Sequence, residues 1–292
     1  MLARALPLLF VLIWSTGFIA ARLVAPYTDP LTFLCYRYLL TIAAFAVIAI
    51  AVGAPWPRGL RAWTNALVAG VLLQGIYLGG VFWAVNDGLP AGIAALVVGL
   101  QPLLTAVLAF PLLGETVGIR KWLGIALGFG GALLVLEPRL AVDMADISAA
   151  PLLAVFAAMF GITLGTIWQK RTGSAADIRT NAAVQFIGAT IVTAPVVLWL
   201  ESGRFEMTWQ AWTGLLWSSL GLSVGAISLL LFLIRRGSVA SVASLFYLVP
   251  PVVAILAYLL FDETLNTLQI VGMGVAVAGV AIASRSGPAA KT

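Results

Sequence analysis

Histidine is absent from the 292-residue chain, and Cys35 is its single cysteine. An intrachain disulfide needs two cysteines, and zinc, haem and proton-relay sites rely largely on histidine and cysteine. Charged residues make up only 9% of the chain, and no aspartate or glutamate lies in the middle of its long apolar runs. The sequence therefore predicts no disulfide, no metal site, no cofactor and no enzymatic activity, and it does not support a carboxylate proton relay.

Apolar residues dominate what is present. They make up 62% of the chain, and the mean hydropathy is +1.08, far above the average of a soluble domain. In lipid, only helices and closed barrels satisfy the hydrogen bonds of the backbone. The apolar runs are long and continuous, which favours helices over strands of alternating polarity. We expect an all-α integral membrane protein that lies almost entirely in the bilayer.

Ten apolar runs approach the roughly 17 to 25 residues that a helix needs to cross a bilayer. The first run follows Arg4, as in a signal peptide, but it has a counterpart in the second half and is expected to be retained. The predicted helices cover residues 5–24, 31–52, 63–85, 91–113, 119–136, 149–168, 179–200, 210–234, 239–260 and 267–284.

The second half of the chain repeats the first. A shift of 148 residues aligns Pro102 with Pro250, Glu115 with Glu263, and Gly131 with Gly279. Each copy has an apolar segment with a central proline, a turn with Glu-Thr, and a glycine-rich apolar segment. We expect one transmembrane domain made of two units of five helices, residues 1–143 and 144–292. Internal repeats of this kind are common in secondary transporters.

The basic residues predict how the chain is oriented. Twelve of the sixteen lysines and arginines fall in loops on the side of the N-terminus, three fall on the other side, and Arg37 lies inside a helix. The positive-inside rule then places both termini in the cytoplasm, and it accounts for the net charge of +5 without a nucleic-acid partner. Because each unit has an odd number of helices, the two units must be inverted, related by a pseudo-twofold axis in the membrane plane.

Several stretches resemble one transporter family. They are WSTGFIAAR, DPLTFLCYRYLL, NDGLPAGIAALVVGLQPLLTAVLAFPLLGET and KWLGIALGFGGALLV in the first half, and SVASLFYLVPPVVAILAYLLFDETL in the second. Together they are similar to the EamA family of the drug/metabolite transporter superfamily. The resemblance implies a bacterial inner-membrane exporter of amino acids or related metabolites, with a central cavity formed mainly by helices 1 to 4 and 6 to 9. Its members include exporters of aromatic amino acids, the YddG type, and the motifs do not separate the substrates.

Amide and aromatic side chains near the expected midplane are candidates for the wall of this cavity. An unpaired amide in hydrocarbon costs several kcal/mol, so Gln74 and Gln101 should face either the substrate or each other across helices 3 and 4. Tyr77 lies about one turn from Gln74 on the same face. Trp14 and Tyr247 could stack on an aromatic substrate or could pack in the core, and Ser15 adjoins Trp14.

Arg37 and three prolines are further candidates. An arginine inside the membrane suggests a functional site, here the capture of a substrate carboxylate. The alternative is an arginine that reaches the outer headgroups or pairs with Asp29 or Asp87. Pro102 and Pro250, the latter followed by Pro251, should kink their helices near the midplane, either as gating hinges or as fixed packing bends.

Glu115 and Glu263 precede the last helix of each unit. We expect these carboxylates to have a structural role at the turn, where they can accept hydrogen bonds from free amides at a helix start.

The sequence thus predicts a carrier with a small-molecule substrate, working by alternating access, for which a monomer would suffice. An exporter of another metabolite or drug class is the alternative, and a membrane assembly subunit is a third.

Overall fold

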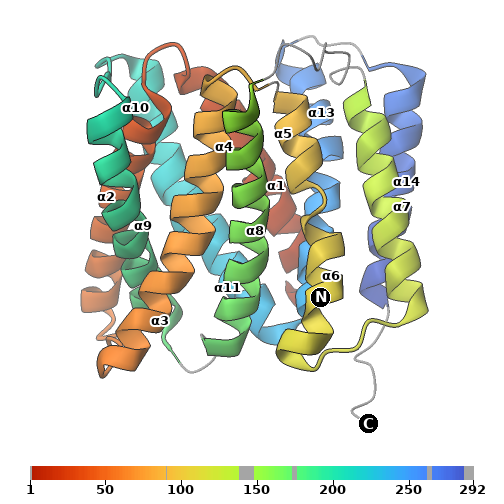
Figure 1. The fold of residues 1–292 in the computed structure, drawn as a ribbon, viewed down its shortest axis with the longest axis horizontal. Helices are drawn as coiled ribbons and strands as arrows, with labels where there is room; N and C mark the ends of the chain where they lie inside the picture. Colours follow the sequence, from red (N-terminus) through yellow and green to blue (C-terminus); the bar gives the residue numbers. More distant parts are fainter. Residues whose placement is uncertain (1, 90, 138–147, 173–175, 262–264, 286–292) are drawn as a thin grey trace.

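The protein is a bundle of helices whose axes lie roughly along one common direction (Figure 1). The structure, a computed structural model, describes residues 2–89, 91–137, 148–172, 176–261 and 265–285. The first half contains α1 (Leu2–Val24), α2 (Pro30–Ala51), α3 (Leu60–Gly70), η1 (Val71–Ile76), α4 (Tyr77–Asn86), α5 (Ala91–Val98), α6 (Gln101–Leu113) and α7 (Ile119–Leu136). The second half contains α8 (Ala149–Thr172), α9 (Ile178–Leu200), α10 (Trp209–Leu216), η4 (Trp217–Ala226), α11 (Ile227–Arg236), α12 (Val239–Ser244), η5 (Leu245–Leu248), α13 (Val249–Phe261) and α14 (Thr267–Arg285).

Eight helical runs in the described residues are long and apolar enough to cross a membrane. Shorter apolar helices over Gln101–Leu113 and Thr267–Ala283 accompany them. The protein is therefore an all-helical, multi-pass membrane protein. One continuous helix was expected over residues 91–113. The structure instead has two helices there, because the run is interrupted at Gly99 and Leu100, where α5 ends and α6 begins.

Two π-helical segments interrupt the helices expected over residues 63–85 and 210–234. The segment η1 lies between α3 and α4, and η4 lies between α10 and α11. The two segments are at equivalent places in the repeat, since a shift of 148 residues puts Val71 at Ser219, inside η4. A π-helix widens the turn and is found often at functional sites. The sequence analysis assumed a constant rise per residue along each helix, and this assumption does not reveal π-helical segments.

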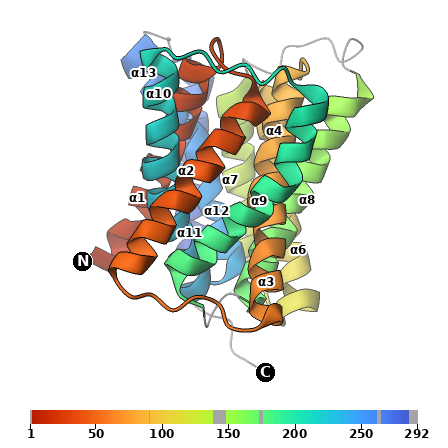
Figure 2. The same cartoon turned by 90° about the vertical axis from the view of Figure 1, so that its left-hand side faces the viewer.

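Each half packs its first helix against the other half. The helix α1 contacts α10, η4 and α13, and the equivalent helix α8 contacts α3, η1, α4 and α6. The equivalent helices α2 and α9 also lie side by side (Figure 2). The start of α2 is next to the end of α9, because Glu201 accepts hydrogen bonds from the backbone N–H groups of Leu31 and Thr32. The two helices are therefore antiparallel.

Helices α7 and α14 form a close pair at one edge of the bundle (Figure 1). Glycines face the partner backbone along the whole contact. A Cβ atom on Gly124 would lie 2.5 Å from the nitrogen of Ala283, and one on Gly131 would lie 2.3 Å from the nitrogen of Ala276. As the residue number increases along α7, the number of the contacting residue on α14 decreases. This equivalent pair is therefore antiparallel as well. Close approach of backbones through small residues is a common way to pack helices in lipid.

Adding one methyl group to this contact should destabilise the protein. We expect Gly131→Ala to lower the free energy of unfolding by about 1–3 kcal/mol, because α7 and α14 must move apart. Gly130 is the matched control, since a Cβ atom there meets nothing within 4 Å. Gly130→Ala should be neutral or stabilise by up to about 1 kcal/mol through helix propensity. Thermal unfolding of the detergent-solubilised variants measures the difference, and equal transition temperatures would contradict the packing described.

Candidate functional site

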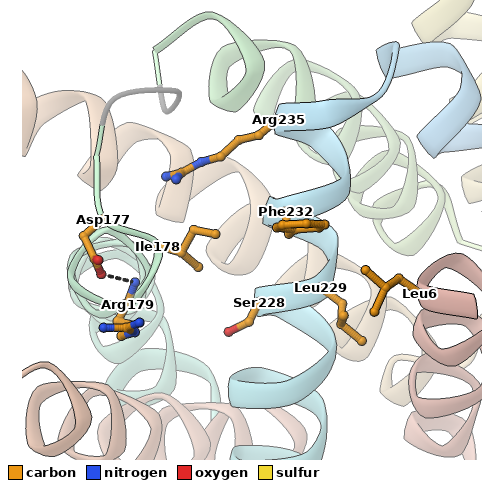
Figure 3. A pocket seen from close by; sticks show the side chains of 8 residues that line it. All are labelled: Leu6, Asp177, Ile178, Arg179, Ser228, Leu229, Phe232 and Arg235. Carbon is orange, nitrogen blue, oxygen red and sulfur yellow. Dashed lines mark hydrogen bonds between the residues drawn. The ribbon is translucent and has the colours of Figure 1, made fainter. Parts of the chain in front are cut away.

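A cavity of about 470 Å³ opens where α1, α9 and α11 meet (Figure 3). This volume is within the range of small-molecule sites in proteins. It lies at the end of the bundle that holds Asp177, at the start of α9, and Arg235, near the end of α11. We call it the Asp177-end cavity. It is lined by Leu6, Asp177, Ile178, Arg179, Ser228, Leu229, Phe232 and Arg235.

The lining combines apolar walls with charged groups. The carboxylate of Asp177 caps α9 by accepting a hydrogen bond of 2.9 Å from the backbone N–H of Arg179. Arg235 donates to the backbone carbonyl of Ala176, and its buried Nε has no hydrogen-bond partner among the described residues. Ser228 and Phe232 project from the neighbouring turns of α11 (Figure 3). A solute with an apolar body and a polar end suits such a lining.

Carboxylates tie the two halves together at the opposite end of the bundle. Oδ2 of Asp29 accepts hydrogen bonds from the N–H and hydroxyl of Ser202 and from the N–H of Arg204. Both carboxylate oxygens of Glu201 accept from the start of α2, at Leu31 and Thr32. Burial alone would raise the pKa of Asp29, but these hydrogen bonds and the charge of Arg204 outweigh it, so the pKa lies below its usual range.

The repeat allows the two ends to be compared residue by residue. Gly80 and Ser228 are 148 residues apart. A Cβ atom on Gly80 would come within 2.8 Å of the carbonyl oxygen of Ala154 on α8, whereas Ser228 lines the Asp177-end cavity. Asp29 bonds to the other half, whereas its counterpart Asp177 bonds within its own helix. Hydrogen bonds join the halves at both ends, as from Val239 to Glu115 near the Asp177 end, but the cavity of about 470 Å³ lies at the Asp177 end.

Arg37 lies between these ends, on α2, with 6% of its surface exposed. Its Nε donates a hydrogen bond of 3.0 Å to the hydroxyl of Ser223, on η4. The hydroxyl of Ser219, also on η4, donates to the backbone carbonyl of Arg37. The side chain therefore points into the bundle, and Asp29, considered as a partner in the sequence analysis, bonds to Ser202 and Arg204 instead.

The two glutamines expected near the midplane are both buried, and they do not bond to each other. Gln101 donates to the hydroxyl of Thr105, one turn further along α6, at 3.2 Å. Oε1 of Gln74 is buried without a hydrogen-bond partner in the described part of the chain. Tyr77 is buried beside it at the start of α4.

The remaining candidates for the cavity wall lie within aromatic and apolar packing. The ring of Trp14 lies 5.3 Å from that of Phe246 in an edge-to-face contact. Ser15 is buried and donates to the carbonyl of Val11 in its own helix. The ring of Tyr247 lies against Gly128 of α7, where a Cβ atom would come within 2.5 Å of it.

The three prolines lie at helix starts. Pro102 is in the first turn of α6, directly after the interruption at Gly99 and Leu100. Pro250 and Pro251 are in the first turn of α13, directly after the 3₁₀ segment η5. A proline is tolerated there because the first amides of a helix have no partner in the helix. Whether these interruptions move during function stays a prediction.

Glu115 reaches a different helix from the one that follows it. Its Oε2 accepts a hydrogen bond of 3.1 Å from the backbone N–H of Val239, at the start of α12. The ammonium of Lys121 donates to the hydroxyl of Ser238, which caps the same helix. Glu263, the counterpart of Glu115, lies outside the described residues.

Sequence reasoning did not select several buried polar residues. Ser219 and Ser223 bind Arg37, and Gln185 donates to Gln169 at 2.7 Å between α9 and α8. Serines are common in apolar helices, so they carry little signal on their own. The repeat offered a signal, because Gln185 is 148 residues from Arg37 and marks the same place in the fold.

The comparisons with known proteins agree with this geometry. A family model described as the EamA-like transporter family matches residues 2–137 and 149–285. The WAT1-related protein At3g02690, chloroplastic, of Arabidopsis thaliana is 28% identical, over 91% of this chain and 66% of that protein, just under two thirds of its length. The uncharacterized inner membrane transporter YedA of Escherichia coli K12 is 29% identical, over 93% and 87%.

Two further matches are a relative and a solved structure. The probable amino-acid metabolite efflux pump of Escherichia coli K12 is 26% identical, over 95% of this chain and 93% of that protein. A solved crystal structure superposes with a TM-score of 0.80 at 18% identity and covers 96% of each chain. At this identity, the structural match bears on the fold alone.

The stability contributed by the hydrogen bonds of Asp29 should depend on pH in the acidic range. Because its pKa is lowered on folding, the charged carboxylate stabilises the fold above its unfolded pKa, and this contribution is lost as the pH falls below about 4. The free energy of unfolding of wild type should exceed that of Asp29→Asn by about 1 kcal/mol at pH 7, and the difference should narrow as the pH falls toward 3. Thermal unfolding in detergent from pH 7 to pH 3 measures it. Asp177→Asn is the control, with a smaller gap at pH 7 because asparagine also caps helices well.

Proposed function

The chain belongs to the EamA-like transporter family, and from this premise we propose that it exports amino acids or related small metabolites by alternating access. It is a membrane transporter and not an enzyme. The observation that carries the mechanism is the contrast between the two ends of the bundle, which are equivalent in sequence but differ in structure. The Asp29 end is closed by hydrogen bonds between the halves, and the Asp177 end holds a cavity.

The proposed topology has ten transmembrane helices in two inverted units of five. The units are residues 1–143 and 144–292, and the boundary between them lies outside the described residues. The antiparallel contacts of α2 with α9 and of α7 with α14 support the inversion. The excess of basic residues in the loops at the Asp177 end supports a cytoplasmic location for that end and for both termini. The protein is then a carrier of the bacterial inner membrane, like YedA by its printed name.

Alternating access follows if the two halves exchange their shapes. In this conformation a solute enters the Asp177-end cavity from the cytoplasm. In the opposite conformation, α9 and residues 53–58 would close over it as α2 and residues 201–206 now close the other end. A single hydrogen bond of 2.9 Å, from Thr180 to the carbonyl of Pro55, already joins these two segments. Pro102, Pro250 and Pro251 are the proposed hinges.

The substrate we propose is a neutral or aromatic amino acid. Support comes from the printed name of the efflux pump relative and from the proposed cavity wall of Trp14, Ser15, Arg37, Gln74, Tyr77, Gln101 and Tyr247, which combines aromatic rings with few charges. A carrier of another metabolite class is the second candidate, favoured by the relatives whose names give no substrate. One chain holds the whole proposed path, so a monomer suffices.

Flux into proteoliposomes that contain only this protein tests the proposal. We expect saturable movement of labelled tryptophan, phenylalanine or another neutral amino acid, with and without an imposed pH gradient. The described spans lack a central carboxylate that could bind a proton, so a gradient should not be required. Folded and inserted protein that moves none of the panel would contradict the amino-acid assignment.

Locking the Asp29 end should stop transport. Thr28 and Phe205 form an isolated antiparallel bridge, and such pairs have Cα atoms about 4.5–5.5 Å apart, which suits a disulfide. In a Cys35→Ala background, oxidation of the double variant Thr28→Cys and Phe205→Cys should abolish flux, and a reductant should restore it. Each single variant is a control. Full flux through the oxidised pair would exclude opening at this end.

A further inference from the structure

Arg37 is a buried charge without a counter-charge. It has 6% of its surface exposed and lies in an apolar span. Among the described residues, it forms no ion pair, and neither terminal Nη nitrogen has a hydrogen-bond partner. A buried cation that lacks an anion is costly, because it loses hydration without compensation. Such a group is retained where an anion can reach it.

The surroundings of Arg37 form a built site. Ser223 accepts a hydrogen bond from its Nε and donates one to the backbone carbonyl of Ser218 at 3.1 Å. The next residue, Tyr38, donates from its phenol to the backbone carbonyl of Gln74 at 2.9 Å. The π-helical segment η4 therefore contacts α2 at Arg37, and η1 contacts it at the next residue, Tyr38. These bonds fix the base of the guanidinium and leave its Nη edge available for a bidentate contact.

A second unsatisfied group lies on η1, the segment that bonds to Tyr38, the neighbour of Arg37. Oε1 of Gln74 is an acceptor without a partner in the described structure, on a side chain with 2% of its surface exposed. Gln74 is held next to α2 by the hydrogen bond of its backbone to Tyr38. Buried amide oxygens are nearly always paired in proteins. The missing partner of this oxygen is an N–H or O–H donor, just as the missing partner of Arg37 is an anion.

We propose that Arg37 binds the carboxylate of the substrate and that Oε1 of Gln74 accepts a hydrogen bond from its amino group. The site would then select zwitterionic amino acids, a substrate class narrower than small metabolites. The inference rests on the proposed function. Ser228 of the Asp177-end cavity is five residues from Ser223 on the same helical run, or about 7 Å along the axis, and the proposed route to the site starts from this cavity.

The second half shows that the fold does not need this charge. Gln185 takes the place of Arg37 there, is fully buried, and donates to Gln169. A glutamine is therefore accommodated at the same position of the same fold, which makes Arg37→Gln a variant that should fold. The charge is then explained by what it binds.

The test compares L-phenylalanine with L-phenylalanine amide, which keeps the ring and the amino group but lacks the carboxylate. In proteoliposomes, the amide should compete with labelled phenylalanine at least about 30-fold more weakly than unlabelled phenylalanine does. Arg37→Gln should weaken phenylalanine by a similar factor and abolish the preference over the amide. Gln74→Met should weaken phenylalanine and leave 3-phenylpropionate, which lacks the amino group, unchanged as a competitor. Arg61→Gln, at an exposed arginine outside the proposed gates, should match wild type.

The outcomes separate the two proposals. If wild type moves another amino acid better, that amino acid and its amide replace phenylalanine. If wild type transports amino acids but the amide competes equally well, or Arg37→Gln keeps the preference, the inference is wrong and the carrier stands. If wild type moves no amino acid, both are wrong. The wild-type comparison of acid with amide decides the question even if Arg37→Gln fails to fold, which thermal unfolding would reveal.

Discussion

Every helix begins with backbone amides that the helix itself cannot satisfy, and this constraint explains how the halves of the protein are joined. The first amides of each helix need acceptors from elsewhere. Glu201, at the end of α9, provides them for α2, and Glu115, in the turn after α6, provides one for α12. Each carboxylate belongs to the opposite half from the helix that it caps. The hydrogen bonds that complete the secondary structure thus also hold the tertiary structure together.

The same constraint separates contacts that can be exchanged from contacts that cannot. Hydrogen bonds at the helix ends, such as those of Asp29 with Ser202 and Arg204, lie where water can replace a lost partner. The contacts deeper in the bundle are apolar packing and buried hydrogen bonds, such as that of Arg37 with Ser223. Movement at the ends therefore costs little free energy, whereas movement in the middle requires another surface of similar shape to pack against. The proposed cycle uses the ends as gates for this reason.

Much of the fold could be predicted from the sequence, because hydropathy and the repeat act over long stretches. The helix expected over residues 119–136 begins and ends where α7 does, and the family expected from the motifs is confirmed. The π-helical segments were missed, because one extra residue per turn leaves an apolar sequence apolar. The direction of Arg37 was left open between the cavity and the outer headgroups. Its choice between the headgroups and Ser223 depends on which helix lies opposite, and this information is tertiary.

The close pair of α7 and α14 has a consequence for how the protein could move. These helices are equivalents of each other, so an exchange of shapes between the halves maps the pair onto itself. Every contact in it, such as Gly131 with Ala276 or Gly124 with Ala283, can therefore persist through the whole cycle. The pair would serve as a stationary frame against which the other helices turn. Its glycines hold the two backbones together without relative movement. The movements of the proposed transport cycle would then occur in the helices outside this pair.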